Sequence, residues 1–225
     1  MAVGFRIKTN WVRVAPDLVA EFATLPVANV SDCMSRLAGL GQALRPMHRA
    51  GGLAGPALTV RCRPGDNLLI HKAIDMAAPG DVIVVDAGGD VTNSLMGELM
   101  LAHATRRGVG GFVLDGAIRD AEAIGGQDLP VFARGITHRG PYKDGPGEIG
   151  HPIALDGTAI EPGDLILGDA DGLVAVRRAD AAEVLAATRK KHEAEERQMA
   201  QTLDGSIDRT WVDRALAAAG CVFED

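Results

Sequence analysis

Short apolar runs alternate with segments of helical hydrophobic spacing through the middle of the chain. The apolar runs cover residues 82–85, 112–114 and 131–133, and the helical segments cover 67–77 and 97–107, the second ended by Gly108. Short apolar runs are typical of buried strands, and their alternation with helices favours an α/β layer. A further strand is predicted over residues 53–63, where Leu58 and Val60 share one face.

The pattern changes beyond residue 134. Residues 135–151 are rich in Gly, Pro and His, and we expect a long loop there. Short strands follow, separated by glycine-containing turns as hairpins or a small barrel would require; they cover residues 153–155, 158–160, 165–167 and 173–176. The predicted domain is therefore mixed α/β and not a simple doubly wound sheet.

Helices are predicted at both ends of the chain, over residues 16–24 and 31–38 and then over 180–203, followed by a last helix that carries Trp211. From residue 188 to 198 the long helix is almost wholly polar. Such a helix is either solvated or in contact with a neighbouring subunit. We expect one catalytic domain over residues 1–178 and a helical extension over 179–225 that reaches a neighbouring subunit.

Composition narrows the class of protein. The 225 residues can bury one good core, the net charge is −7, and no basic run indicates nucleic acid as the partner. No apolar run approaches the roughly 20 residues of a membrane span, and residues 1–10 lack the apolar core of a signal peptide. Cys33, Cys62 and Cys221 are odd in number and far apart, which fits reduced thiols and a cytoplasmic location.

Candidate chemistry gathers at two points. The strand over 112–114 is predicted to enter a turn that delivers Arg119 and Asp120 side by side, and residues 93–100 look like a loop entering a helix at Gly97. A helix start offers N–H groups, arginine pairs with carboxylates, and aspartate is an oxygen ligand for metals. An adjacent Arg-Asp pair is most often a surface or capping feature, but strand ends are where ligands bind in α/β sheets. The combination suits an anionic keto acid.

Four motifs in order carry a family resemblance: Gly97-Glu98-Leu99-Met100, residues 115–120 (DGAIRD), residues 162–166 (PGDLI) and residues 169–172 (DADG). From about Val27 to the final helix, the chain resembles the 4-hydroxy-4-methyl-2-oxoglutarate aldolases, a family that also contains the regulator of ribonuclease activity A proteins. The resemblance implies an α/β/β/α sandwich of the swivelling-domain type, assembled as trimers or hexamers. It also implies Mg²⁺ or Mn²⁺, cleavage of a 4-hydroxy-2-oxo acid with release of pyruvate, and often decarboxylation of oxaloacetate.

The resemblance assigns roles to individual residues around the Gly97 helix start. Asp120 matches the direct protein ligand of the metal, and Arg119 matches the arginine that contacts the pyruvate part of the substrate. Leu99 and Met100 match positions whose backbone N–H groups hold the substrate carboxylate. A metal and a guanidinium would stabilise the enolate charge that develops when the carbon–carbon bond breaks.

Two glutamates are implied as partners of metal-bound water, the candidate base for the 4-hydroxyl proton. Glu98 stands where many relatives have aspartate, although a glutamate in a first helical turn also simply favours the helix dipole. Glu195 matches a residue that enters the adjacent subunit's site, with Glu193 and Glu196 as close alternatives. Together with Asp120 and Arg119 they complete the predicted site.

Other polar residues have simpler interpretations. His71 and His103 lie inside predicted helices and are interpreted as packed or capped, whereas His138 and His151 are candidates for lining the cleft. Asp86, Asp169 and Asp171 are explained by turn chemistry, and the repeated Pro-Gly-Asp tripeptide marks local turns.

Two other functions stay open beside the aldolase. One is a non-enzymatic regulator that binds a ribonuclease, although proteins of that branch are typically shorter and lack a C-terminal extension. The other is a related lyase or decarboxylase acting on a sugar-derived acid, because residues 137–143 depart from the expected aldolase pattern. The sequence leaves the exact substrate, the metal and the choice between trimer and hexamer undecided.

Overall fold

The computed structural model describes residues 3–224. The helices are α1 (Pro16–Phe22), α2 (Val27–Cys33), α3 (Leu68–Met76), α4 (Glu98–Arg107), α5 (Ala121–Gly125), α6 (Ala181–Asp204) and α7 (Thr210–Ala218). The strands are β1 (Phe5–Ile7), β2 (Arg45–Pro46), β3 (Leu53–Cys62), β4 (Val82–Asp86), β5 (Ser94–Met96), β6 (Gly111–Ile118), β7 (Val131–Ile136), β8 (Gly147–Ile149), β9 (Ile153–Leu155), β10 (Thr158–Ile160), β11 (Leu165–Gly168) and β12 (Leu173–Val176).

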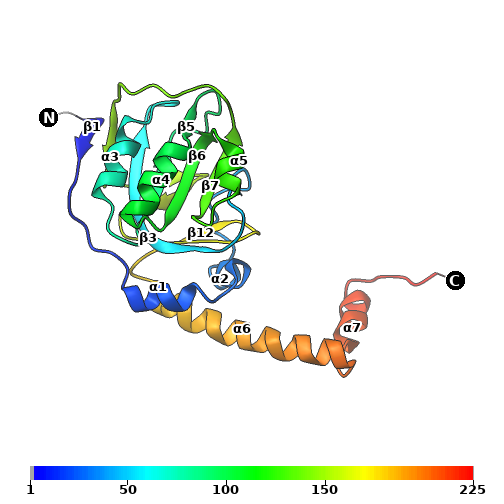
Figure 1. Ribbon diagram of the computed structural model, residues 1–225. Coiled ribbons are helices and arrows are strands. Elements are labelled where there is room, and N and C mark those ends of the chain that lie inside the picture. Colours follow the sequence, from blue (N-terminus) through cyan, green and yellow to red (C-terminus); the bar gives the residue numbers. More distant parts are fainter. Residues whose placement is uncertain (1–2, 225) are drawn as a thin grey trace. The chain divides into compact units, whose positions relative to one another are not determined.

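The main sheet has the order β1-β8-β3-β4-β6-β7-β2 (Figure 1). Its centre is parallel: β3 pairs with β4, β4 with β6, and β6 with β7. The first half of β3 leaves this sheet and pairs antiparallel with β11, which in turn pairs with β12. Strands β3, β11 and β12 form a second, antiparallel sheet, so β3 belongs to both sheets. The predicted α/β alternation over residues 67–133 is confirmed.

Three buried clusters define the layers. The first lies between α3, α4 and one face of the main sheet and includes Ile70, Leu101 and Leu114. The second lies between the two sheets, where Phe132 and Ile166 contribute. The third packs the outer face of β11 and β12 against α1, α2 and the start of α6. This order of layers is α/β/β/α, as the family resemblance implied.

The helix predicted over residues 31–38 is misplaced. Helix α2 covers Val27–Cys33, and Pro26 occupies its N-cap position. Ser35 and Arg36 both have positive φ angles, 57° and 62°, a conformation that cannot continue a right-handed helix. Pro26 lies directly before the first helical residue, and the two left-handed residues end the helix.

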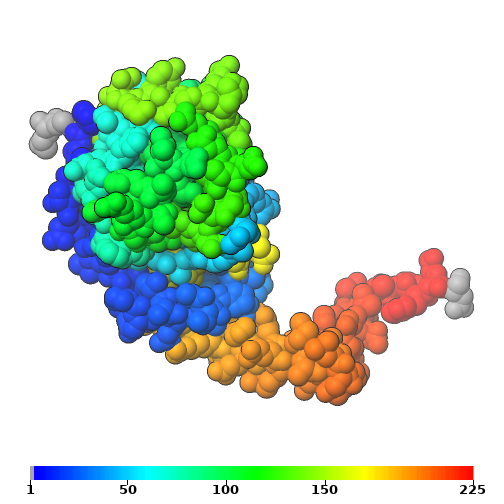
Figure 2. All heavy atoms as spheres, viewed as in Figure 1, coloured from blue at the N-terminus to red at the C-terminus, as the bar shows by residue number. Residues whose placement is uncertain are grey.

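The loop predicted over residues 135–151 is only partly a loop. Strand β7 continues to Ile136, and β8 (Gly147–Ile149) pairs with both β3 and β1. A side chain at Gly147 would meet the Arg61 carbonyl oxygen at 2.4 Å, so glycine is what allows this close approach. The rest of the segment crosses one end of the sheet at the surface, over α3 and α4 (Figures 1 and 2).

Strand β6 is longer than the predicted run of 112–114. It continues through Asp115 and Gly116 to Ile118, so no turn precedes Arg119. Strands β5 and β7 both pair with Ala117 and Ile118, which keeps this end of β6 extended. Strand β5 and the short helix α5, which follows Asp120, were not predicted. They frame the two residues that the sequence singled out.

The chain divides into two compact units, one up to Thr188 and the other from Arg189 onward. The first contains the sandwich and the start of α6, where Leu185 and Thr188 are buried. The second contains the rest of α6 and α7, in which no residue is buried. Across residues 3–224, no helix combines the length and the apolar character that a bilayer span requires.

Candidate functional site

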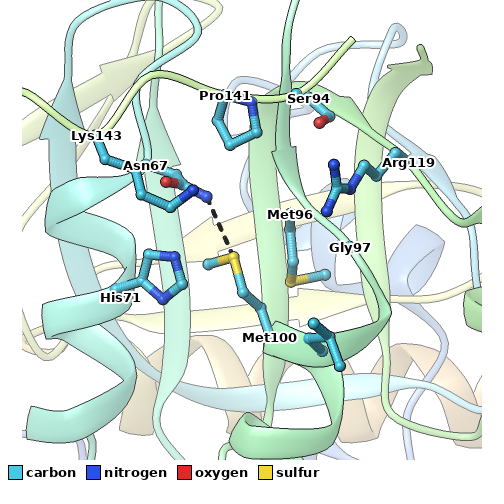
Figure 3. A pocket seen from close by; sticks show the side chains of 11 residues that line it. Asn67, His71, Ser94, Met96, Gly97, Met100, Arg119, Pro141 and Lys143 are labelled. Carbon is cyan, nitrogen blue, oxygen red and sulfur yellow. Dashed lines mark hydrogen bonds between the residues drawn. The ribbon is translucent and has the colours of Figure 1, made fainter. Parts of the chain in front are cut away.

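A cavity of about 320 Å³ opens at the carboxyl ends of the parallel strands. Ligands bind at this edge in open α/β sheets. The lining residues come from the start of α3, from β5, from the start of α4, from the end of β6 and from the surface segment that follows β7; they are Asn67, His71, Ser94, Met96, Gly97, Leu99, Met100, Arg119, Gly140, Pro141 and Lys143. Figure 3 shows Asn67 and His71 on one side of the cavity and Arg119 on the other.

Asp120 lies directly against the start of α4. Its Oδ2 accepts a hydrogen bond from the Glu98 N–H at 2.9 Å. Asp120 occupies the N-cap position of α5, but its side chain makes no capping bond to that helix, and its φ of 55° is left-handed. A strained aspartate that turns away from its own helix is unusual and favours a functional interpretation over a capping one.

Arg119 lies next to Asp120 and Gly97, and these three residues form a corner beside the cavity. The Arg119 N–H donates to the Met96 carbonyl oxygen at 2.9 Å, which holds the end of β6 beside β5. The Nε atom lies 3.6 Å from Asp120 Oδ2, and about two-fifths of each side chain is exposed. The guanidinium is therefore held by its backbone and by one carboxylate, while a substantial part of it stays accessible. Arg119, Asp120 and the helix start at Gly97 therefore lie side by side in the structure, as predicted.

Among the described residues, some of the first N–H groups of α4 have a hydrogen-bond acceptor and one has none. The Glu98 N–H donates to Asp120, and the Met100 N–H donates to the Gly97 carbonyl oxygen at 3.1 Å. Within residues 3–224, the Leu99 N–H has no hydrogen-bond acceptor. Leu99 is thus the more direct donor for a bound carboxylate, and Met100 could donate only as a shared, bifurcated group. Their predicted role in substrate binding stays a prediction.

Gly97 is needed for space and not for backbone conformation. Its φ of −145° is open to any residue, but an added Cβ would lie 2.4 Å from Asp120 Oδ2 and 3.0 Å from Arg119 Nε.

Gly97→Ala should therefore displace both side chains and lower kcat/KM about 100-fold, since small misplacements of reacting groups cost that much. Steady-state kinetics with a 4-hydroxy-2-oxo acid, the substrate class that the family resemblance implies, would measure this loss.

Gly126→Ala is a suitable control for that variant, because its added Cβ would meet only ordinary contacts at 3.6 Å. The control should keep wild-type kinetics. Equal activity of Gly97→Ala and wild type would mean that Arg119 and Asp120 are not held in a reactive geometry by this corner.

The two predicted glutamates lie in different units. Glu98 is exposed at the first position of α4, next to the Asp120 contact. Glu195 lies in the second unit, on α6, where its Oε1 pairs with Lys191 at 2.8 Å. Every residue that lines the cavity belongs to the first unit. The part assigned to Glu195 therefore stays a prediction, as does the water-holding part of Glu98.

Sequence reasoning missed the α3 side of the cavity. Asn67 is buried, and its Nδ2 donates to the Leu95 carbonyl oxygen at 3.0 Å and to Met100 Sδ at 3.3 Å (Figure 3). Its Oδ1 is buried without a hydrogen-bond partner among the described residues. Buried polar atoms nearly always have a partner, so this oxygen is an open acceptor at the cavity wall. The signal in the sequence that could have pointed to Asn67 was its position directly after Asp66, the last residue of a turn.

The histidines are distributed differently from the expectation. His71, interpreted as packed or capped, lines the cavity, whereas neither His138 nor His151 does. His103 pairs with Asp75 at 2.9 Å on the surface. Helical position alone cannot tell which face of α3 meets a cavity, because that face is decided by how α3 packs on the sheet.

His71 and Lys143 line the same cavity, and the charge of Lys143 acts on His71. The pKa of His71 is lowered from 6.5, first by burial and then by the positive charge of Lys143.

Lys143→Met removes that charge, so the pKa of His71 should rise towards 6.5. An NMR titration of the imidazole would measure the shift, with Lys72→Met as a control on the exposed side of α3. A pKa of His71 that stays unchanged in Lys143→Met would contradict the proximity.

The corner is compatible with a divalent metal that keeps most of its waters. Within residues 3–224, no three His, Cys, Asp or Glu side chains cluster as a closed metal site would need. Asp120 Oδ2 is occupied by the Glu98 N–H, while Oδ1 has no hydrogen-bond partner in the described part of the chain. One open carboxylate oxygen suits Mg²⁺ or Mn²⁺, which bind through few protein ligands.

Two comparisons with known proteins agree on one family. The family described as "RraA-like: Aldolase/RraA" matches residues 27–175. A protein of Halalkalibacterium halodurans named "Putative 4-hydroxy-4-methyl-2-oxoglutarate aldolase" is 40% identical over 190 residues, which covers 83% of this chain and 90% of that protein.

Solved structures share the fold. An uncharacterized protein from Pseudomonas syringae pv. tomato superposes with a TM-score of 0.79 at 28% identity, covering 88% of this chain and 97% of that one. The RNA-processing inhibitor RraA from Thermus thermophilis gives a TM-score of 0.63 at 28% identity, covering 67% of this chain and 92% of that one.

Proposed function

The chain belongs to the RraA-like family, and from this premise we propose that it is a divalent-metal-dependent lyase that cleaves a 4-hydroxy-2-oxo acid to release pyruvate. The observation that carries the proposal is the corner formed by Gly97, Arg119 and Asp120 beside the cavity. The 40% identical relative carries an aldolase name, and 4-hydroxy-4-methyl-2-oxoglutarate is accordingly the first substrate to test.

The 2-oxo acid end of the substrate binds at the start of α4. The open Leu99 N–H donates to its carboxylate, helped by the positive end of the helix dipole. The Arg119 guanidinium faces the keto oxygen and remains charged at any working pH. Asp120 would hold Mg²⁺ or Mn²⁺ through its open oxygen, and the bound ion would supply Lewis-acid stabilisation of the negative charge that develops during cleavage.

Cleavage breaks the bond between C3 and C4 of the substrate. The 4-hydroxyl loses its proton as C4 becomes a carbonyl, and the electron pair of the broken bond moves into the enolate of pyruvate, which takes up a proton at C3. Glu98 accepts the hydroxyl proton by way of a water molecule, and Glu195 of a neighbouring subunit shares this task. Arg119 stabilises the enolate oxygen, where charge appears only in the transition state. Loss of CO₂ from oxaloacetate would use the same stabilised enolate.

Asn67 supports a hydroxylated substrate. Its unpartnered Oδ1 needs a donor, and its Nδ2 is already committed to Leu95 and Met100. A hydroxyl group of the bound acid can donate to this oxygen, whereas a purely aliphatic chain would leave it unpaired.

Self-association is part of the proposal. Leu99 lines the cavity and is 83% exposed, and Tyr142, beside the lining residue Lys143, is 55% exposed. Apolar and aromatic side chains at the rim of a polar site suit coverage by a second copy, in a trimer or a hexamer. Light scattering at micromolar concentration would measure the assembly.

The experiment that tests the function is a screen of 2-oxo acids with Mg²⁺ or Mn²⁺, coupled to pyruvate detection. We expect metal-dependent release from at least one 4-hydroxy-2-oxo acid and loss of release with EDTA. No release from any acid in the screen would contradict the proposal.

A regulator of ribonuclease is the second candidate, favoured by the structural similarity to the RNA-processing inhibitor RraA. That alignment covers 67% of this chain, against 83% for the relative with an aldolase name. Binding of a purified ribonuclease in a pull-down, together with a negative lyase screen, would favour the regulator.

A further inference from the structure

The chain contains three turns of the same sequence, each ending in a buried aspartate. They are Pro64-Gly65-Asp66, Pro79-Gly80-Asp81 and Pro162-Gly163-Asp164. In each turn the aspartate N–H donates to the carbonyl oxygen three residues before it, at 3.0, 3.0 and 3.1 Å. Each glycine has a positive φ, which this proline-glycine turn requires.

The second and third turns use their carboxylates locally. Asp81 Oδ2 accepts the Ala78 N–H, and Asp164 Oδ2 accepts the Glu161 N–H, both at 2.9 Å. In both cases this oxygen accepts the amide three residues earlier and closes its own turn. Asp81 also pairs with Arg13, and Asp164 Oδ1 also accepts the Arg178 N–H at 2.9 Å.

Asp66 departs from this arrangement. Its Oδ1 accepts the Leu68 N–H at 3.0 Å, at the start of α3. Its Oδ2 accepts the N–H groups of Asp144 and Gly145 at 2.8 and 2.9 Å, far away in sequence. The carboxylate therefore joins α3 to the segment that follows β7, and Arg63 at 3.3 Å offsets part of its charge.

This segment forms one wall of the cavity. Gly140, Pro141 and Lys143 line it, and Asp144 follows immediately. Two further bonds tie the same regions together: Tyr142 N–H to the Gly65 carbonyl oxygen at 2.9 Å, and Asn67 N–H to the Tyr142 carbonyl oxygen at 3.0 Å. The side chain of Asp66 is fully buried beneath this junction and is absent from the cavity wall.

We propose that Asp66 is a positioning residue that holds Lys143 and its neighbours against the start of α3 and so shapes the end of the cavity remote from Arg119. The proposal rests on the lyase function. Asn67 and His71 from the start of α3 and Lys143 from the segment that follows β7 lie together at that end (Figure 3). The part of the substrate beyond the pyruvyl group is what this end meets, and Asp66 therefore governs its recognition without touching it.

Asp66→Asn is the test variant, because it keeps the size of the side chain but turns one acceptor oxygen into an NH₂ donor. That donor must face either the Leu68 N–H or the N–H groups of Asp144 and Gly145, so one side of the junction opens. Asp81→Asn is the matched control: it has the same tripeptide and the same burial, its arginine partner Arg13 binds both carboxylate oxygens, and no lining residue of the cavity is among its hydrogen-bond partners.

Hydrogen exchange is the first measurement and needs no enzymatic activity. In Asp66→Asn, the amides of Asp144 and Gly145 should exchange about tenfold faster or more, since their acceptor is lost, while Asp81→Asn leaves them as in wild type. Unchanged exchange of these two amides in Asp66→Asn would overturn the proposal, and so would equal acceleration in both variants.

Kinetics are the second measurement. For the 4-hydroxy-2-oxo acid that wild type cleaves, Asp66→Asn should raise KM about tenfold with kcat within about twofold, because ground-state binding of the remote part is weakened. An unchanged KM, or a loss confined to kcat, would overturn the positioning role. If wild type cleaves no 2-oxo acid, the lyase proposal fails on its own, and hydrogen exchange still decides whether Asp66 holds the segment.

Discussion

Asp120→Asn should lower kcat/KM for pyruvate release at least about 1,000-fold, because it removes the proposed metal ligand and with it the stabilisation of the enolate. Asparagine is the informative replacement. It tolerates the left-handed conformation of Asp120 and can still accept the Glu98 N–H. The free energy of unfolding should therefore change by only about 1 kcal/mol. Steady-state kinetics and thermal unfolding measure the two effects separately.

Metal binding gives this prediction a readout besides activity. Titration with Mn²⁺, followed by electron paramagnetic resonance, should show binding to wild type and a large loss of affinity in Asp120→Asn. Glu122→Gln removes the same charge from the first turn of α5 and should bind Mn²⁺ as wild type does. Full activity of Asp120→Asn, or equal Mn²⁺ affinity in both proteins, would refute the assignment of Asp120.

Arg119→Lys should lower kcat/KM about 100- to 1,000-fold, the range found when one preorganised donor to a developing oxyanion is lost. Lysine keeps the charge but not the planar fork that binds a carboxylate and a keto oxygen together. The backbone bond from Arg119 to Met96 does not depend on the side chain, so the fold should be retained. Circular dichroism would verify the fold beside the kinetic measurement.

Arg106→Lys, on the exposed last turn of α4, is the control for that substitution and should leave the kinetics unchanged. The expected loss in Arg119→Lys is mainly in kcat, since the oxyanion forms only in the transition state. A variant in which only KM rises would instead make Arg119 a residue for substrate binding. A variant with wild-type constants would remove it from the site.

Much of the scaffold around these residues could be predicted from local patterns. The helix that begins at Gly97 ends at Gly108, whose left-handed φ of 75° is the conformation expected for a glycine that ends a helix. The hairpins β9–β10 and β11–β12 lie where the glycine-containing turns placed them. These features depend on residues close in sequence, so periodicity and turn chemistry were sufficient.

The misplaced helix over residues 31–38 has a local cause, but the errors over β6, β8 and His71 share another, which is contact between segments far apart in sequence. Strand β6 continues to Ile118 because β5 and β7 pair with it there, and β8 forms because Gly147 can approach β3. His71 meets the cavity because of the rotation with which α3 packs. Neither hydrophobic spacing nor turn residues report such contacts.

The sequence by itself determined the alternation of strands and helices, the three Pro-Gly-Asp turns and the adjacency of Arg119 and Asp120, since each follows from local backbone preferences. The tertiary structure alone decided which side chains share a cavity. The Asp120 carboxylate meets the Glu98 amide across 22 residues of chain, and the Asp66 carboxylate meets Gly145 across 79. Such pairings form only when the layers pack. Which amide lies next to each carboxylate is decided by the arrangement of the whole sheet and not by the neighbouring residues in the sequence.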